Sequence, residues 1–215
     1  LNDFKENMDK ESSAKVSTAK ALCPNNPQSN ELVFRALDDI IDAFQPEIIH
    51  IGGDEVEHIG GDQYCQEEYE RLGRIGVLLS YFIKIRYYLS SKGIIAGIWG
   101  DMLLSLSGEN RYDGKLCEEK YLARNLEMFN ELRRGTLIYD WWYTGESKKS
   151  IKFFVEKDFN VVSAASTHGC MTSIPSFDQQ LNIRALFADT LKYGLRGGMI
   201  TEWINGFGYH AEQTY

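Results

Sequence analysis

Two adjacent carboxylates, Asp54 and Glu55, are the residues of this sequence best suited to chemistry. They follow an apolar run in the segment IIHIGGDEVEHIGG, residues 48–61. Paired carboxyl groups can serve as general acid, general base and stabiliser of developing positive charge. Adjacent side chains on a regular strand point to opposite faces, so both can reach one ligand only where the strand ends or bulges. Gly52 and Gly53 permit such a backbone. The alternative to a catalytic role is that Asp54 and Glu55 form a solvated strand end or a helix cap.

Two histidines bracket this pair and raise the question of a metal. His50 lies within the apolar run, where an interior histidine with satisfied hydrogen bonds is the alternative to a ligand-binding role. His58 could assist Glu55 or line a pocket. A zinc or manganese site using His50, Asp54, Glu55 and His58 is conceivable. The segment has no H-x-H or H-E-x-x-H pattern, so we expect neither a metal nor another cofactor.

The elements that would position these residues alternate regularly along the chain. Apolar runs at 47–53, 94–99, 136–142, 160–166 and 197–203 predict buried strands. Amphipathic segments predict helices at 62–76, 77–91, 118–133 and 148–157. A helix before them is capped by Ser29 or Asn30 and ends at Phe44. A helix after them starts at Ser176 or Asp178 and ends at Gly194. This alternation indicates an α/β fold with parallel strands, either an open doubly wound sheet or a (β/α)₈ TIM barrel.

Two observations favour the barrel. The first strand is not followed by a Gly-rich phosphate-binding fingerprint, and polar or aromatic residues crowd the carboxyl end of nearly every strand, where a barrel builds its active site. They are Trp99 and Asp101, Asp140 to Tyr143 including Trp141 and Trp142, Ser166 to His168, and Glu202 to Asn205 including Trp203. Five strands predict the last five of eight, strands four to eight, so we interpret residues 1–215 as one partial barrel domain.

Composition and charge limit the partners. The net charge of −8 argues against nucleic acid and against an anionic membrane surface. Neither a transmembrane stretch nor a signal peptide is visible, which favours a cytoplasmic protein. The first residue is not Met, and this start predicts a piece of a longer protein. An open sheet would then need a missing segment or a second copy, a homo-oligomer, to cover its edge.

The cysteines carry no recognisable local motif. The sequence has four, at positions 23, 65, 117 and 170, and no two of them form a C-x-x-C pair. This spacing predicts neither a zinc motif nor a redox motif, and it favours four reduced thiols.

HIGGDEV resembles the signature of family 20 glycoside hydrolases, which reads roughly His-x-Gly-Gly-Asp-Glu. The extension EHIGG and the segment GIWGDML resemble the branch typified by hexosaminidase D, and LCPNNPQSNEL resembles the Pro-rich turn before the helix that precedes the signature. The resemblance implies a TIM-barrel catalytic domain and a retaining exo-β-N-acetylhexosaminidase. Such an enzyme removes a terminal N-acetylhexosamine, N-acetylglucosamine or N-acetylgalactosamine, by substrate-assisted catalysis through an oxazolinium intermediate.

The resemblance also implies roles for individual residues. Glu55 would protonate the leaving oxygen and then deprotonate the incoming water, and Asp54 would hold the acetamido N–H. Asp101 would bind a sugar hydroxyl or orient Glu55, unless it merely caps the next segment. The remaining candidates for substrate binding are His50, Trp99, Trp141, Trp142, Tyr143, Trp203 and Asn205, with core or loop packing as the alternative for each tryptophan.

Some positions depart from the family pattern. Where many members carry Tyr-x-Asp after the seventh strand, this chain has ASTHGC, residues 165–170. Where many carry Trp-x-Glu at the eighth strand, it has Trp203, Ile204 and Asn205. The sequence also shows no first strand with the arginine that binds the far sugar hydroxyls. These departures suggest an inactive or sugar-binding relative as the main alternative, ahead of a metal-dependent hydrolase.

Overall fold

The fold is half of a (β/α)₈ barrel. A computed structural model describes residues 22–56, 59, 62–107, 117–143, 149–168 and 177–203. Its five strands form one parallel sheet in sequence order: β1 Ile48–His50, β2 Ile95–Trp99, β3 Thr136–Trp141, β4 Asn160–His168 and β5 Gly197–Glu202. A doubly wound sheet would show a reversal of strand order. The unbroken order β1 to β5 is that of a barrel, as the sequence predicts.

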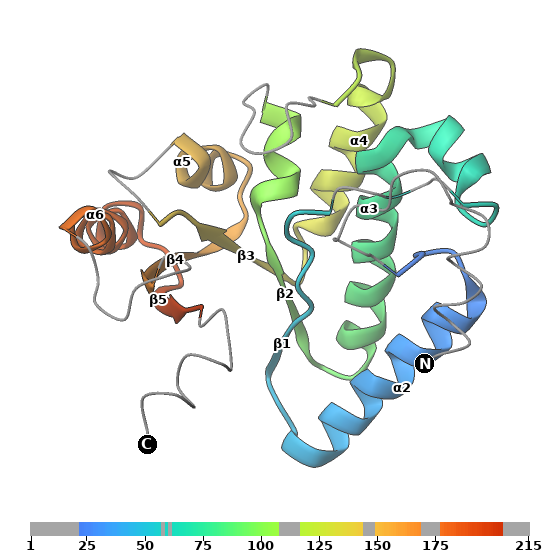
Figure 1. Cartoon of the computed structure of the whole chain (residues 1–215), viewed down its shortest axis with the longest axis horizontal. Coiled ribbons are helices and arrows are strands. Elements are labelled where there is room, and N and C mark those ends of the chain that lie inside the picture. Colours follow the sequence, from blue (N-terminus) through green and yellow to red (C-terminus); the bar gives the residue numbers. More distant parts are fainter. Residues whose placement is uncertain are drawn as a thin grey trace, which may run out of the picture.

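Helices connect the strands and pack against one face of the sheet (Figure 1). They are α2 Pro27–Phe44, α3 Gln66–Ser91, α4 Glu119–Leu132, α5 Lys149–Glu156 and α6 Phe177–Tyr193, with a 3-10 helix η1 at Asp101–Ser107. None of the helices in the described part is long and apolar enough to cross a membrane. Each connection from one strand to the next therefore carries a helix, which is what parallel pairing requires.

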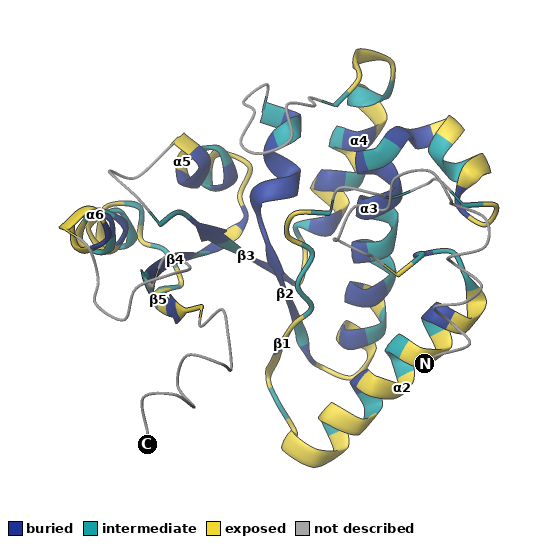
Figure 2. Ribbon diagram, in the orientation of Figure 1, coloured by how far each residue is buried: buried dark blue, intermediate teal, exposed yellow. Residues whose placement is uncertain are grey.

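The main core lies between this face and helices α3 to α5. Its largest members are almost inaccessible to solvent: Phe82, Ile98, Phe129, Ile138 and Phe154. In Figure 2 the buried colour runs along the inward side of α3 and through β2 and β3, whereas α2 is largely exposed. The opposite face of the sheet carries aromatic and polar side chains, and these form the candidate site.

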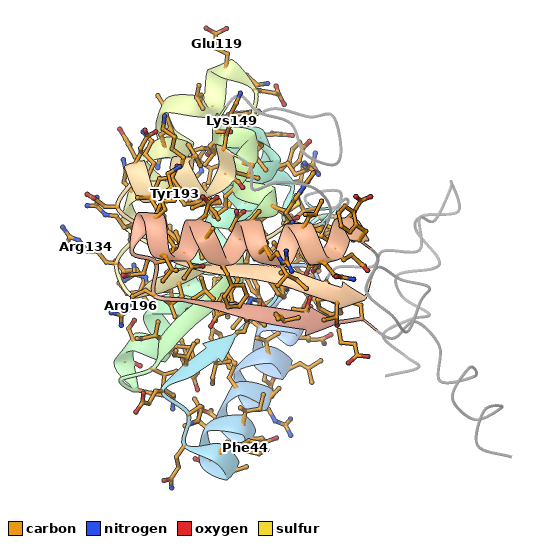
Figure 3. The ribbon with its side chains drawn as sticks, turned by 90° about the vertical axis from the view of Figure 1, so that its left-hand side faces the viewer. Phe44, Glu119, Arg134, Lys149, Tyr193 and Arg196 are labelled. Atoms are coloured by element: carbon orange, nitrogen blue, oxygen red, sulfur yellow. The ribbon has the colours of Figure 1, made fainter. Side chains whose placement is uncertain are left out.

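All strands start at the same end of the sheet. Figure 3 shows Arg134 and Arg196, which precede β3 and β5 respectively, at the end of the strands away from the arrowheads. The carboxyl ends of the strands therefore lie together at the opposite end of the sheet, and the residues that follow the strands can meet there.

Two helices differ from the expectation at their amino-terminal parts. Helix α2 starts at Pro27, not after Ser29 or Asn30, and the Asn26 side chain accepts a hydrogen bond from the Gln28 N–H at 2.9 Å. Proline suits the first helical position, because its missing N–H has no helical partner there. The two helices expected at 62–76 and 77–91 form the single element α3, kinked at Gly73 with φ 68° and ψ 178°.

Candidate active site

The turn after β1 places the two carboxylates at the carboxyl ends of the strands. Strand β1 ends at His50, so Asp54 and Glu55 lie beyond the pleat that would separate them. Gly52, Gly53 and Glu55 all have positive φ, of 74°, 93° and 48°. Left-handed backbone at a glutamate is uncommon and needs support from its surroundings. Both carboxylate residues are exposed, so a ligand can reach them.

Gly53 is held by close packing. A Cβ at this position would lie 2.4 Å from Cζ of Phe82, a residue of α3 that is 2% exposed. Only glycine lets the turn approach the helix so closely. Gly53 of the signature therefore has a packing role that fixes the turn against the core.

Asp101 supports the turn from the end of β2. Its carboxylate accepts the backbone N–H of Glu55 at 3.0 Å and the indole N–H of Trp141 at 3.2 Å. Asp101 therefore contacts the Glu55 backbone, and it is also the first residue of η1. Burial raises the pKa of Asp101 to about 6, while the two N–H groups oppose the shift and the charge of Asp54 adds to it.

Aromatic side chains from three strand ends surround this support. Trp99 and Trp203 have ring centroids 6.2 Å apart, and Trp141 and Tyr143 lie 4.9 Å apart. The Trp203 indole N–H donates to the Tyr143 hydroxyl at 2.7 Å. The pKa of Tyr143 is raised, mainly by burial and in small part by the charges of Asp54 and Glu55. These contacts bring the two carboxylates and the aromatic residues into one neighbourhood.

His50 points to the same side of the sheet. Its ring lies 4.4 Å from Trp99 and 4.6 Å from Tyr139, centroid to centroid. Nδ1 accepts the Gly52 N–H at 3.1 Å, so the ring proton of the neutral form is on Nε2. His50 keeps part of its surface exposed, but partial desolvation of its ring lowers the pKa of His50 to about 4, which makes the imidazole neutral near pH 7.

Tyr139 is a neighbour of the site that the sequence analysis missed. It lies two residues before Trp141 on β3, so strand alternation places both on one face. Once the direction of Trp141 is known, the same alternation turns Asp140 to the helix side. There its carboxylate accepts a hydrogen bond from Ser150 of α5 at 2.7 Å.

The remaining candidates are placed less centrally. Trp142 is half-buried, and its backbone N–H donates to the Ala164 carbonyl at 3.2 Å. Asn205 and His58 lie outside the described residues. Within the described ranges, His50, Asp54 and Glu55 do not bring their ligand atoms together as a metal-binding group. The geometry thus places two adjacent exposed carboxylates beside an aromatic wall.

Comparisons with a protein family and with solved structures give matches for this chain. The chain matches the model of the glycosyl hydrolase family 20 catalytic domain over residues 2–171. It is similar to the crystal structure of a beta-N-acetylhexosaminidase from Bacteroides fragilis NCTC 9343, with a TM-score of 0.57 and 15% identity, covering 86% of this chain and 36% of that one. It is also similar to Dispersin B, with a TM-score of 0.50 and 14% identity, covering 94% and 57%.

The two solved structures are considerably longer than this chain, which spans 36% of one and 57% of the other. At such low identity the likeness shows the shared fold. A comparison with curated proteins gives no match.

Proposed function

The chain belongs to glycosyl hydrolase family 20 through its catalytic domain, and from this membership we propose that it carries the acid–base machinery of a retaining exo-β-N-acetylhexosaminidase. The observation that carries the proposal is the turn after β1. It presents Asp54 and Glu55 side by side, with Glu55 itself in left-handed backbone, and Asp101 accepts the Glu55 N–H. The substrate we propose is a terminal N-acetylhexosamine, and the hexosaminidase D branch is the proposed subgroup.

The proposed reaction uses the acetamido group of the substrate as nucleophile. The acetamido oxygen attacks the anomeric carbon while Glu55 protonates the departing glycosidic oxygen. Asp54 accepts the acetamido N–H and stabilises the positive charge that develops in the oxazolinium ring. Glu55 then removes a proton from water, which opens the ring with overall retention of configuration. Adjacent carboxylates suit this division, because one faces the leaving group and the other the acetamido arm.

The aromatic wall would hold the sugar. Indole faces stack on the apolar face of a pyranose and exclude water. Trp203, which is 39% exposed, is proposed to stack on the sugar, and the buried Trp99 and Trp141 are proposed to form the wall behind it. We propose that Tyr143 contacts the substrate as well. Its hydroxyl already accepts the Trp203 N–H at 2.7 Å, and it can donate its own proton to a sugar or acetamido oxygen. This tyrosine would offset the absence of Tyr from the stretch after β4.

The test compares two leaving groups in the full chain and its variants. Glu55→Gln is expected to lower kcat on a natural glycoside, a poor leaving group, by about 10²- to 10⁴-fold. An aryl N-acetylhexosaminide with an acidic phenol should lose much less in the glycosylation step, because this leaving group needs little protonation. Glu47→Gln, an exposed glutamate at the opposite end of β1, is the matched control and should keep full activity. Equal losses on both substrates would remove Glu55 as the acid.

A second measurement separates an active enzyme from a sugar-binding relative. A thiazoline inhibitor that mimics the oxazolinium ring should bind the unmodified chain and lose most of that affinity in Asp54→Ala. Turnover together with this loss supports the hexosaminidase. Inhibitor binding without turnover by the unmodified chain would favour the sugar-binding alternative, which the departures at residues 165–170 and 205 suggest.

A further inference from the structure

Two cysteines that lie far apart in the sequence meet beside the first turn of α3. Cys23 precedes α2, and Cys65 is the residue before α3; their Sγ atoms are 3.2 Å apart. Asp62 completes the group, with Oδ1 at 3.1 Å from the Cys23 Sγ. The ligand atoms of all three residues lie within 4.8 Å of one another. From this arrangement we infer a binding site for a divalent metal ion of the zinc type.

The surroundings hold this group in place. The turn that carries Cys23 is tied to α3, because Asn25 Nδ2 donates to Glu68 at 2.7 Å and Lys84 Nζ donates to the Pro24 carbonyl at 3.0 Å. The Asp62 carboxylate accepts the N–H groups of Tyr64 and Cys65 at 2.8 and 3.2 Å. Hydrogen bonds of this kind orient metal-binding carboxylates. Three donors are therefore fixed before any ion arrives.

The chemistry of the donors favours zinc. Two thiolates and a carboxylate are ligands that zinc accepts in tetrahedral sites, and water can take the fourth position. Cys65 is fully buried while Cys23 and Asp62 are half-exposed, so an ion can enter from the solvent side.

The observed sulfur separation is nearer to that of a metal site than to that of a disulfide. Thiolates bound to tetrahedral zinc at about 2.3 Å lie about 3.8 Å apart, so the observed 3.2 Å must open by about 0.6 Å. A disulfide of about 2.05 Å would require the sulfurs to close by about twice that distance.

The site joins the turn before α2 to the start of α3. Asp62 comes seven residues after Glu55, so the bound ion would anchor the chain just beyond the proposed catalytic turn. The site could not be predicted from a local cysteine motif, because its two sulfur ligands are 42 positions apart in the sequence. It is separate from the carboxylate pair, so it does not depend on the proposed hexosaminidase activity.

Cobalt is the probe for the test, because Co²⁺ bound by thiolates absorbs in the near ultraviolet and tetrahedral Co²⁺ absorbs in the visible. The full chain, kept reduced with a phosphine, is titrated with Co²⁺ and then with Zn²⁺. We expect both bands to saturate at one equivalent and to disappear when zinc replaces cobalt. Zinc should also raise the Tm. A folded, reduced chain without the thiolate band would overturn the proposal.

Variants locate the ion. Cys23→Ser and Cys65→Ser should each lose the thiolate band or weaken cobalt binding by at least about tenfold, since even loss of an outer-shell partner costs this much. Asp62→Asn can still accept the two amides and preserve the turn, and it should also bind cobalt more weakly. Cys117→Ser, another half-buried free cysteine, is the matched control and should bind normally. Bands unchanged in Cys23→Ser, or a linked Cys23–Cys65 peptide in unreduced protein whose reduced form binds no cobalt, would overturn the metal site.

Discussion

Asp101 is the side chain on which the geometry of the Asp54–Glu55 turn most directly depends. Its carboxylate accepts N–H groups from Glu55 and Trp141, and it thereby links the turn to the aromatic wall. Protonation of Asp101 would place a proton on one of its two oxygens, each of which accepts one of these N–H groups. Because the pKa of Asp101 is raised to about 6, the protonated fraction grows as the pH falls through this value, within the range where enzymes are assayed.

We therefore expect an acid limb near pH 6 in the profile of kcat/KM. Asp101→Asn should abolish that limb, since the amide does not titrate, and lower kcat/KM at pH 7 by about 10- to 100-fold through misplacement of Glu55. The measurement is a pH–rate profile of the full chain on an N-acetylhexosaminide. Asp42→Asn, on the exposed part of α2, should keep the limb. An unchanged limb in Asp101→Asn would assign it to another group.

His50 yields a prediction that needs no substrate. Removal from water lowers its pKa to about 4, well below the usual value of 6.5. A histidine whose pKa is lowered by folding stabilises the fold above pH 6.5, and that contribution is lost as the pH falls toward 4. In an NMR titration, one histidine resonance should shift with a midpoint far below 6.5, and His50→Gln should remove it. A midpoint at or above 6.5 would show that the ring is not desolvated.

The face of the sheet to which each side chain points could not be predicted from the sequence pattern alone. In YDWWY, alternation says that Asp140 and Trp141 face opposite ways, but it does not say which faces the helices. The direction follows only from partners distant in sequence, Ser150 for Asp140 and Asp101 for Trp141. In contrast, the position of Asp54 and Glu55 at a strand end could be predicted, because the apolar run and the glycines are local features.

At the scale of elements, the number, order and direction of the strands in the described chain follow from apolar periodicity, and the structure confirms them. Boundaries were less predictable. Pro27 looked like a turn residue but starts α2, and Gly73 permits a kink in α3 where the Tyr121 ring leaves no room for a side chain. The 3-10 helix after β2 was not predicted, because its apolar residues are buried without a helical or strand period that marks them.

The contact between the turn after β1 and helix α3 gives a prediction at this scale. Gly53→Ala should destabilise the fold by about 1–2 kcal/mol for the left-handed backbone and by about a further 1–3 kcal/mol for crowding Phe82. Gly93→Ala is the matched control, because its φ is +77° but a Cβ there meets nothing within 4 Å. Chemical denaturation should show a larger loss for Gly53→Ala. Equal losses would mean that backbone strain alone matters at both positions.

At the scale of the whole molecule, the sheet has two edges within the described residues, β1 and β5. Each carries an exposed apolar side chain, Ile48 at 41% and Ile200 at 47% exposure. Edge strands with unpaired N–H and C=O groups and apolar side chains tend to pair with another chain. This arrangement favours the expectation that a second copy covers an edge when the chain is studied alone.

We expect the chain to self-associate through such an edge. Sedimentation velocity over a range of micromolar concentrations should show a mass above that of one chain. Ile200→Lys removes apolar burial of about 1.5–3 kcal/mol and adds a charge that the interface would have to desolvate. It should therefore weaken association by at least about tenfold, since about 1.4 kcal/mol is a factor of ten. Glu127→Lys, a charge change on an exposed position of α4, should leave association intact. If the chain sediments as a monomer at every concentration, or if Ile200→Lys associates as strongly as the unmodified chain, the edge at β5 is not the contact and its strand is protected by other means.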